Sequence, residues 1–301
     1  MAHLLKGIFP PIATPFKKKC LSVDYQSLKF NLEKLSKTKL KGILVQGSNG
    51  EFAALNDKER IELISKSKEY LSNDKVLLCG SGTEGTNTTI DMTNAMADAG
   101  ADAAMVITPS YYKAAMNDEK LVKHFKLVAD SSKIPIVLYN VPKFTNVHLT
   151  DKAILDLAEH ENIIGMKESD GTCIEDKTPK IVEGLKNLKD PNFILMAGSA
   201  GFIQKHYALG GEGSVCALAN VLPDLVCQLH DDPTNEDLQK ELILPNDLVT
   251  AKYGVAGLKH AMDHLGFYGG PVRGPLVGLG DQAKIEIQNI FGPYKEVEDS
   301  W

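Results

Sequence analysis

One lysine closes a fully apolar run near the middle of the chain, in the stretch NIIGMKESDG from Asn162 to Gly171. The four residues before Lys167 are apolar or glycine and predict a buried strand. Burying an ammonium without a partner costs several kcal/mol or lowers its pKa. A desolvated lysine is a nucleophilic amine near neutral pH and can form a Schiff base with a keto acid. Lys167 is therefore a candidate nucleophile, and the alternative is a side chain that extends past the strand end into water.

Tyrosines, hydroxyls and amides follow other apolar runs, whereas no histidine and no cluster of carboxylates does. In Schiff-base chemistry the iminium acts as an electron sink, so a neighbouring carbon–carbon bond can break or form. A tyrosine can move the proton, and a hydroxyl with backbone N–H groups can hold a carboxylate. This chemistry needs no metal or other cofactor. The residues that would supply it are Ser48 and Asn49 in GSNGE, Tyr111 and Tyr112, Tyr139 and Asn140, Ser169, and Gly198 with Ser199.

Ordinary structural explanations also exist for these residues. A core tyrosine with a satisfied hydroxyl accounts for Tyr139 as well. A tight turn between a strand and a helix accounts for the glycines of GSNGE, and such a turn would itself create backbone donors. A contact between subunits accounts for Tyr111 and Tyr112.

Eight short apolar runs recur along the chain, with helical patterns between them. Each run is rich in Val, Ile, Leu or Met and lacks strict alternation, which is typical of strands buried on both faces of a parallel sheet. The runs are GIFPPIATPF from residue 7, GILVQGS from 42, VLLCGSG from 76, AAMVITP from 103, IPIVLYN from 134, IIGMKES from 163, FILMAGS from 193 and GSVCAL from 213.

The segments between the runs predict helices. LNDKERIELISKSKEYL has an N-cap at Asn56 or Asp57, Glu59 in its first turn and apolar residues at helical spacing. Strand–helix alternation repeated eight times indicates an α/β protein with a (β/α)8 TIM barrel, whose active site lies at the C-terminal ends of the strands. We expect a barrel domain over residues 1–219 and a helical C-terminal region over 220–301 that packs on the barrel.

The composition disfavours several classes of protein. The 301 residues are 43% hydrophobic and 24% charged, with a net charge of −6, which is ordinary for a globular protein and does not suggest binding to nucleic acid or an anionic membrane. No apolar run approaches the roughly 18 residues of a membrane-spanning helix. The N-terminus has no signal or transit peptide pattern, and five widely spaced cysteines indicate reduced thiols. We expect a cytoplasmic protein, or a mitochondrial one only if a presequence precedes this chain.

Two further motifs have competing interpretations. His260 and His264 stand four residues apart on a predicted helix, a spacing that can bind zinc, but no third ligand is evident and we expect no metal site. GGPVRGP from Gly269 has the glycines of a phosphate loop without the strand-then-helix context. We interpret it as a turn after the last long helix.

Three motifs together resemble a known family. GSNGE, the YNVP tyrosine and the GMKES lysine are similar to motifs of the dihydrodipicolinate synthase / N-acetylneuraminate lyase family of pyruvate-dependent class I aldolases. The resemblance covers nearly the whole chain, from GIFPPIATPF to GGPVRGPL. Segments such as VQGSNGEF, AGSAGF and FYGGPVRGPL look like the animal 4-hydroxy-2-oxoglutarate aldolase branch.

The resemblance implies roles for individual residues. Lys167 would form the Schiff base and Tyr139 would transfer the proton. Ser48 and Asn49 would bind the carboxylate of the pyruvyl group. Tyr112 would enter the site of a neighbouring subunit in a homotetramer. The rest of the pocket would be lined by Ser169, Gly198 and Ser199.

One departure from the family pattern bears on the substrate. Dihydrodipicolinate synthases usually carry an arginine in the loop after YNVP, where this chain has NVPKFTN with Phe144. This difference argues against dihydrodipicolinate synthesis and favours reversible cleavage of 4-hydroxy-2-oxoglutarate to pyruvate and glyoxylate.

Other functions stay open at this point. One is an aldolase for 2-keto-3-deoxy sugar acids, or an N-acetylneuraminate lyase, on the same scaffold. A second is a metal-dependent aldolase. A third is a keto-acid-binding barrel without turnover. This alternative is disfavoured by the joint presence of Lys167, Tyr139 and the GSNGE loop.

Overall fold

A barrel of eight parallel strands forms the centre of the molecule. The computed structural model describes residues 1–189 and 191–295, so the end of the predicted C-terminal region, 296–301, lies outside the described residues. All eight predicted strands are present. They are β1 (Ile8–Phe9), β2 (Gly42–Val45), β3 (Val76–Gly80), β4 (Ala103–Ile107), β5 (Ile136–Asn140), β6 (Ile163–Glu168), β7 (Ile194–Ala197) and β8 (Ser214–Val215).

The strands follow one another around the barrel in the order β1-β8-β7-β6-β5-β4-β3-β2. Between β2 and the segment after β1, the backbone N–H of Ile12 donates to Leu44 O at 2.9 Å and that of Leu44 donates to Pro10 O at 2.9 Å. These two bonds bring the ends of the sheet together. The predicted (β/α)8 barrel is thus confirmed.

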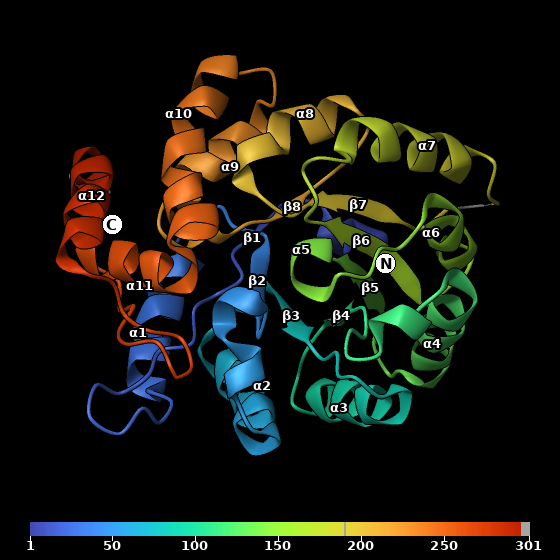
Figure 1. Cartoon of the computed structure of the whole chain (residues 1–301), viewed down its shortest axis with the longest axis horizontal. Helices are drawn as coiled ribbons and strands as arrows, with labels where there is room; N and C mark the ends of the chain where they lie inside the picture. The colour runs from blue at the N-terminus through green and yellow to red at the C-terminus, as the bar shows by residue number, and fades with distance from the viewer. Residues whose placement is uncertain (190, 296–301) are drawn as a thin grey trace.

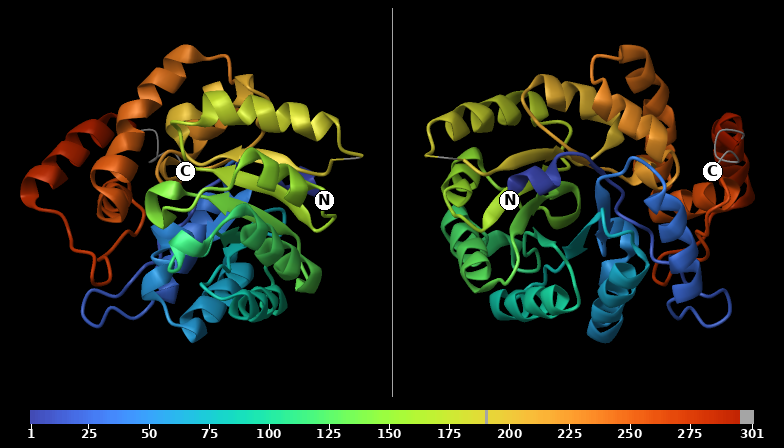
Figure 2. Two further views of the ribbon diagram at one scale, coloured as in Figure 1. Left: turned by 45° about the vertical axis from the view of Figure 1, so that its right-hand side comes forward. Right: turned by 180° about the vertical axis from the view of Figure 1, so that it is seen from behind.

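Helices surround the strands on the outside (Figures 1 and 2). The structure has α1 (Tyr25–Ser36), α2 (Asp57–Tyr70), α3 (Thr86–Asp98), α4 (Asp118–Ser131), α5 (Pro142–Thr145), α6 (Asp151–Ala158), α7 (Ile174–Lys186) and α8 (Ile203–Ala208), and then α9 (Pro223–Asp231), α10 (Glu236–Asp247), α11 (Gly254–His264) and α12 (Asp281–Phe291). Asn56 caps α2 in a capping box with Glu59, as the sequence predicted.

The strands bury both of their faces. One set of side chains, including Phe9, Leu44, Met105 and Met196, fills the barrel interior. The alternate residues pack against the helices in a second, larger cluster. This division explains why the strand sequences are continuously apolar, since neither face meets water.

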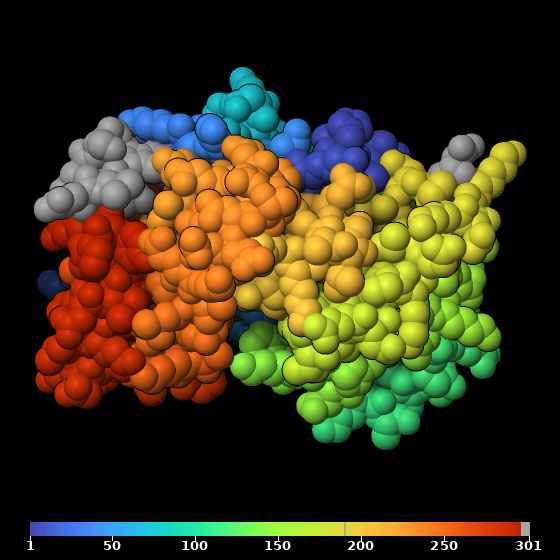
Figure 3. All heavy atoms as spheres, turned by 90° about the horizontal axis from the view of Figure 1, so that it is seen from above, coloured from blue at the N-terminus to red at the C-terminus, as the bar shows by residue number. Residues whose placement is uncertain are grey.

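The C-terminal helices lie on one side of the barrel, with α12 packed against α11 (Figure 1). In the space-filling view the orange and red segments form a continuous surface with the yellow barrel helices (Figure 3). Between α10 and α11 the chain forms a π-helical turn, Leu248–Lys252, just after Pro245. The helical C-terminal extension is confirmed, and the domain boundary at residue 219, between β8 and α9, stays a prediction.

Two further properties concern cysteines and membranes. The five cysteines are free thiols, as predicted. Within residues 1–189 and 191–295, no helix combines the length and apolarity that crossing a membrane demands.

Candidate active site

Lys167 and Tyr139 lie side by side on neighbouring strands. They are register partners in the β5–β6 ladder, and the Lys167 Nζ lies 4.4 Å from the centroid of the Tyr139 ring. Lys167 is 4% exposed and Tyr139 6% exposed. The Lys167 side chain therefore does not extend into water past the strand end. An amine next to a phenol in a buried setting is suited to imine formation and proton transfer.

A small cavity of about 10 Å³ lies beside Tyr139. Ser48 and Gln46 are polar residues of its lining, and the apolar residues come from β2 and β4 and include Phe52. Lys167 and Asn49 are not among its lining residues. The cavity brings together two of the predicted site residues, Ser48 and Tyr139. A largely apolar cavity with a few polar groups is typical of small-molecule sites.

The GSNGE loop follows β2 and forms a tight turn. Ser48–Gly50 is one turn of 3-10 helix, closed by bonds from the Gly50 N–H to Gly47 O at 2.9 Å and from the Glu51 N–H to Ser48 O at 3.1 Å. Thr14 Oγ1 donates to Gly50 O at 2.6 Å. This geometry confirms the tight turn and places Ser48 at the cavity.

The loop begins on a residue in an unusual conformation. Gln46 has φ +67°, a left-handed backbone that non-glycine residues rarely adopt. Its side chain is buried and bonded to Arg60: the guanidinium Nε donates to Gln46 Oε1 at 3.1 Å, and the Gln46 amide donates to the Arg60 carbonyl. Arg60 also donates to Gly80 O at 2.9 Å. Arg60, which the sequence analysis did not single out, thus fixes the start of the loop.

A buried carboxylate follows Lys167 directly. Glu168 forms an ion pair with Lys177 of α7 at 2.8 Å. It also accepts a bond at 2.9 Å from the Asn140 side-chain amide to each of its oxygens. Because side chains alternate along a strand, Glu168 and Lys167 point to opposite sides. The cluster ties the end of β5 to the end of β6 and so holds Tyr139 and Lys167 in register.

The loop after β7 is tied to both the barrel and the C-terminal region. The Gly198 N–H donates to Glu168 O at 2.7 Å, and a Cβ at Gly198 would collide with the Ser169 hydroxyl. Glycine is therefore required there by the close approach of Ser169. The Ser199 hydroxyl donates to Asn246 of α10 at 3.2 Å.

Tyr111 and Tyr112 lie outside the cavity. They are 77% and 71% exposed, with their rings in a T-shaped contact at 5.0 Å. Glu84 fixes their loop by accepting bonds at 2.8 Å from the N–H groups of Ser110 and Tyr111. Both rings therefore lie at the surface, on a loop that Glu84 fixes.

The histidine pair lies on α11, as predicted. In the part of the chain that the structure describes, no group of three or more His, Cys, Asp or Glu residues is arranged to hold a metal ion. Neither His260 nor His264 is among the residues that line the cavity.

The sequence model that describes the dihydrodipicolinate synthetase family matches residues 4–292 of this chain. The chain belongs to this family. Two relatives named 4-hydroxy-tetrahydrodipicolinate synthase are each 34% identical: one from Methanothrix thermoacetophila over 96% of both chains, and one from Methanoculleus marisnigri over 94% of this chain and 97% of the relative. The dihydrodipicolinate synthase structure from Aquifex aeolicus has a TM-score of 0.88 at 27% identity, covering 96% of this chain and 98% of that one.

Membership of the dihydrodipicolinate synthetase family makes the protein an enzyme. It is a carbon–carbon lyase of the class I, pyruvate-dependent aldolase type, which works through a lysine Schiff base. The family that the sequence motifs indicated is confirmed. The names of these relatives do not support the predicted closeness to the 4-hydroxy-2-oxoglutarate aldolase branch.

Proposed function

We propose that this enzyme cleaves 4-hydroxy-2-oxoglutarate reversibly to pyruvate and glyoxylate, with Lys167 as the Schiff-base lysine. The observation that carries the proposal is the buried Lys167 side chain, whose Nζ lies 4.4 Å from the ring of Tyr139, a residue that lines a cavity together with Ser48. In this assignment Ser48 and Asn49 bind the carboxylate of the pyruvyl end, with the backbone donors of their turn. No metal or organic cofactor takes part.

The proposed reaction proceeds in three steps. The Lys167 amine attacks the C2 ketone, and loss of water gives an iminium. The C3–C4 bond then breaks, its electron pair moves to the iminium to form an enamine, and Tyr139 takes the C4 hydroxyl proton as glyoxylate leaves. Protonation of the enamine at C3 and hydrolysis of the imine release pyruvate and restore the amine.

The far carboxylate of the substrate needs donors from another part of the rim. Four residues of the rim are candidates: Asn140, Lys143, Ser169 and Ser199. Asn140 uses its amide on Glu168 and its oxygen on the Leu149 N–H, and the Ser199 hydroxyl is bonded to Asn246. Ser169 and Lys143 are the two left for the substrate, and we propose Ser169 because it lies two residues after Lys167.

A second candidate activity is 4-hydroxy-tetrahydrodipicolinate synthesis, which the names of the relatives favour. Phe144 speaks against it, because this residue stands where dihydrodipicolinate synthases usually carry an arginine. Its side chain is 61% exposed and offers a carboxylate no hydrogen bond.

A substrate panel separates these activities. We expect kcat/KM for 4-hydroxy-2-oxoglutarate to exceed by at least about tenfold, or about 1.4 kcal/mol of transition-state binding, the values for 2-keto-3-deoxygluconate, 2-keto-3-deoxygalactonate and N-acetylneuraminate. Condensation of pyruvate with aspartate semialdehyde is measured on the same preparation. A sugar acid preferred by tenfold, or efficient use of the semialdehyde, would replace the proposed substrate and leave the Schiff-base mechanism intact.

We also propose a homotetramer in which Tyr112 reaches a neighbouring subunit's site. Support comes from the exposure of Tyr111 and Tyr112 on a loop that Glu84 fixes. Light scattering of the active enzyme is expected to give four times the mass of one chain. Full activity in a species with the mass of one chain would contradict this assembly and the role of Tyr112. A cytoplasmic location stays a prediction.

A further inference from the structure

Glu51, the last residue of GSNGE, is held in an unusual conformation. Its backbone has φ +55°, the left-handed region again, although it is not glycine. Its side chain is 1% exposed. Left-handed non-glycine residues persist only where the surrounding structure determines them, and they gather at functional sites. The question is therefore what holds the Glu51 side chain.

A buried lysine of the C-terminal region supplies the first contact. Lys259 of α11 forms an ion pair with Glu51 at 2.5 Å, and both side chains are 1% exposed. The same ammonium donates to Pro271 O at 2.8 Å and lies 4.4 Å from the centroid of the Phe16 ring. Burial lowers the pKa of Lys259, and the Glu51 carboxylate opposes that shift. Lys259 is therefore fully occupied within the protein.

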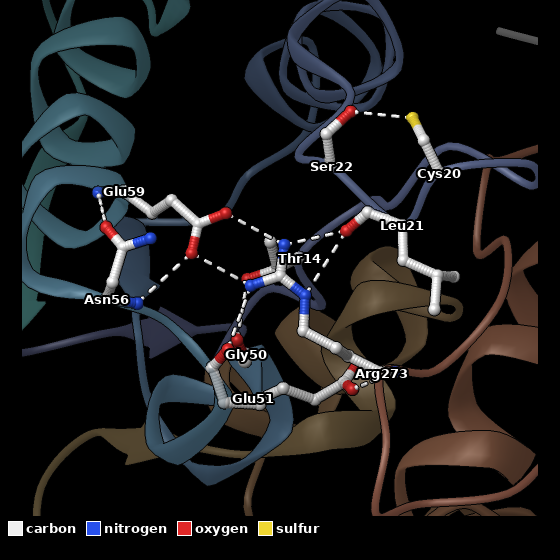
Figure 4. A network of polar contacts seen from close by, with 10 residues as sticks. Thr14, Cys20, Leu21, Ser22, Gly50, Glu51, Asn56, Glu59 and Arg273 are labelled. Carbon is white, nitrogen blue, oxygen red and sulfur yellow. Dashed lines mark hydrogen bonds and ion pairs between the residues drawn. The ribbon is translucent and has the colours of Figure 1, made fainter.

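Arg273 supplies the second contact. Its backbone N–H donates to Glu51 Oε2 at 2.8 Å. Its guanidinium forms a two-pronged ion pair with Glu59 of α2, at 2.8 Å for each bond, and donates to Leu21 O at 2.7 Å and Ala54 O at 2.8 Å. Figure 4 shows the guanidinium between Glu59 and Leu21, with the Glu51 side chain directed toward the Arg273 backbone.

We propose that Lys259 and Arg273 are positioning residues, which hold the GSNGE loop through Glu51 so that Ser48 and Asn49 face the pyruvyl carboxylate. The inference rests on the proposed function, because it takes the carboxylate-binding role of that loop as given. Neither residue touches the substrate. The C-terminal region thereby acts on the first half of the barrel across more than two hundred residues of sequence, as the Glu51–Arg273 separation of 222 shows.

The contacts of Glu51 with Lys259 and Arg273 are coupled to Ser48 through the backbone of the loop. The Glu51 N–H closes the 3-10 turn on Ser48 O, so a rotation of the Glu51 backbone changes the turn that presents Ser48. Without its buried partners, the left-handed conformation of Glu51 has no compensation. The loop would then relax, and its donors would move away from the carboxylate position, which weakens binding in site geometries of this kind.

The test uses a charge-neutral double variant, Glu51→Gln with Lys259→Met. It conserves volume and leaves no buried charge unpaired, so the fold is expected to survive. Arg273→Met is a second, independent variant, because this side chain is partly exposed. The control is Lys252→Met with Glu286→Gln, which removes a more exposed 2.5 Å ion pair of the C-terminal region, between the π-helical turn and α12.

Pyruvate is the probe, and two readouts are compared. The first is the pyruvate concentration for half-maximal borohydride trapping, which we expect to rise about tenfold or more in the double variant, the effect of one lost hydrogen bond to a charged group. Arg273→Met keeps the backbone N–H bond to Glu51 and removes the guanidinium bonds to Glu59, Leu21 and Ala54 that hold this segment, so we expect a smaller rise in the same direction. The second is hydrogen exchange of the amides of residues 47–51, which we expect to become faster. The control should match the wild type in both.

The outcomes separate this inference from the proposed function. A folded double variant with the wild-type half-saturation for pyruvate overturns the positioning role, because a merely structural role would lower thermal stability alone. If the wild type itself is not modified by pyruvate, the proposed function fails. In that case hydrogen exchange of the amides of residues 47–51 tests the positioning inference alone. Unchanged exchange in the variants overturns the inference as well, and faster exchange supports it.

Discussion

Replacing Lys167 with arginine is expected to abolish turnover, with kcat lower by about 10⁴-fold or more, the scale seen when a catalytic nucleophile is removed. A guanidinium stays protonated at every accessible pH and has no free electron pair to attack a ketone. Charge is retained in this variant, so the loss would be due to the missing nucleophile. Steady-state cleavage of 4-hydroxy-2-oxoglutarate, followed by pyruvate release, measures it.

A control is needed because Lys167 lies in the barrel interior, where a larger side chain strains the packing. Lys167→Met removes the amine and keeps nearly the same shape. Its unfolding temperature is expected to equal or exceed that of the wild type, since a buried ammonium is removed. If Lys167→Met is folded and retains more than about a hundredth of the wild-type kcat, far above the loss expected for a nucleophile, the assignment of Lys167 is wrong.

Replacing Tyr139 with phenylalanine is expected to lower kcat by about 10² to 10⁴-fold, the range for loss of a positioned acid–base group. The ring stays 4.4 Å from the Lys167 Nζ, so its packing against the lysine is retained. Only the hydroxyl that moves the C4 proton is missing. Pyruvate should still be trapped on Lys167, because that step does not break a carbon–carbon bond.

The matched control for this variant is Tyr207→Phe. Tyr207 is another largely buried tyrosine, whose hydroxyl forms a bond of 2.7 Å with His230 Nδ1 on the helices α8 and α9. It is not among the residues that line the cavity. We expect a small loss of stability and an unchanged kcat. Equal losses of kcat in both variants would mean that Tyr139 acts through packing and not through proton transfer.

The barrel could be predicted because its strands have a strong local signal. Every strand is buried on both faces, so each appears as a short apolar run. The exact bounds were less predictable: the run from residue 7 yields only Ile8–Phe9, since Pro10 and Pro11 lack the N–H groups that extend a strand. The places of Lys167 and Tyr139 at the ends of β6 and β5 were predictable for the same local reason, since they are polar residues near the ends of apolar runs. Their roles in the reaction stay predictions.

The groups that hold the site were not predictable in this way. Lys177 and Lys259 lie on helices, where sequence alone predicts that a lysine is exposed. Both are buried instead: Lys177 pairs with the buried Glu168, and Lys259 pairs with the buried Glu51. The tertiary fold determines which carboxylate each lysine meets, so the local spacing of residues cannot predict the pair.

GGPVRGP was interpreted as a turn after the last long helix, and this interpretation was incomplete. The segment is indeed irregular, but α12 follows it, so α11 is not the last long helix. Arg273, within the segment, contacts the first half of the barrel at Glu51 and Glu59. A glycine- and proline-rich composition predicts the turn and says nothing of what its one charged side chain binds.

The central claim is that Lys167 forms the covalent intermediate, and borohydride reduction in the presence of pyruvate tests it most directly. Reduction of the imine fixes a lactyl-type group on the amine that reacted, and mass spectrometry of the digested protein locates it. We expect one modified residue per chain, at Lys167, with simultaneous loss of activity. Modification at a different lysine, or no modification at all, would contradict the account.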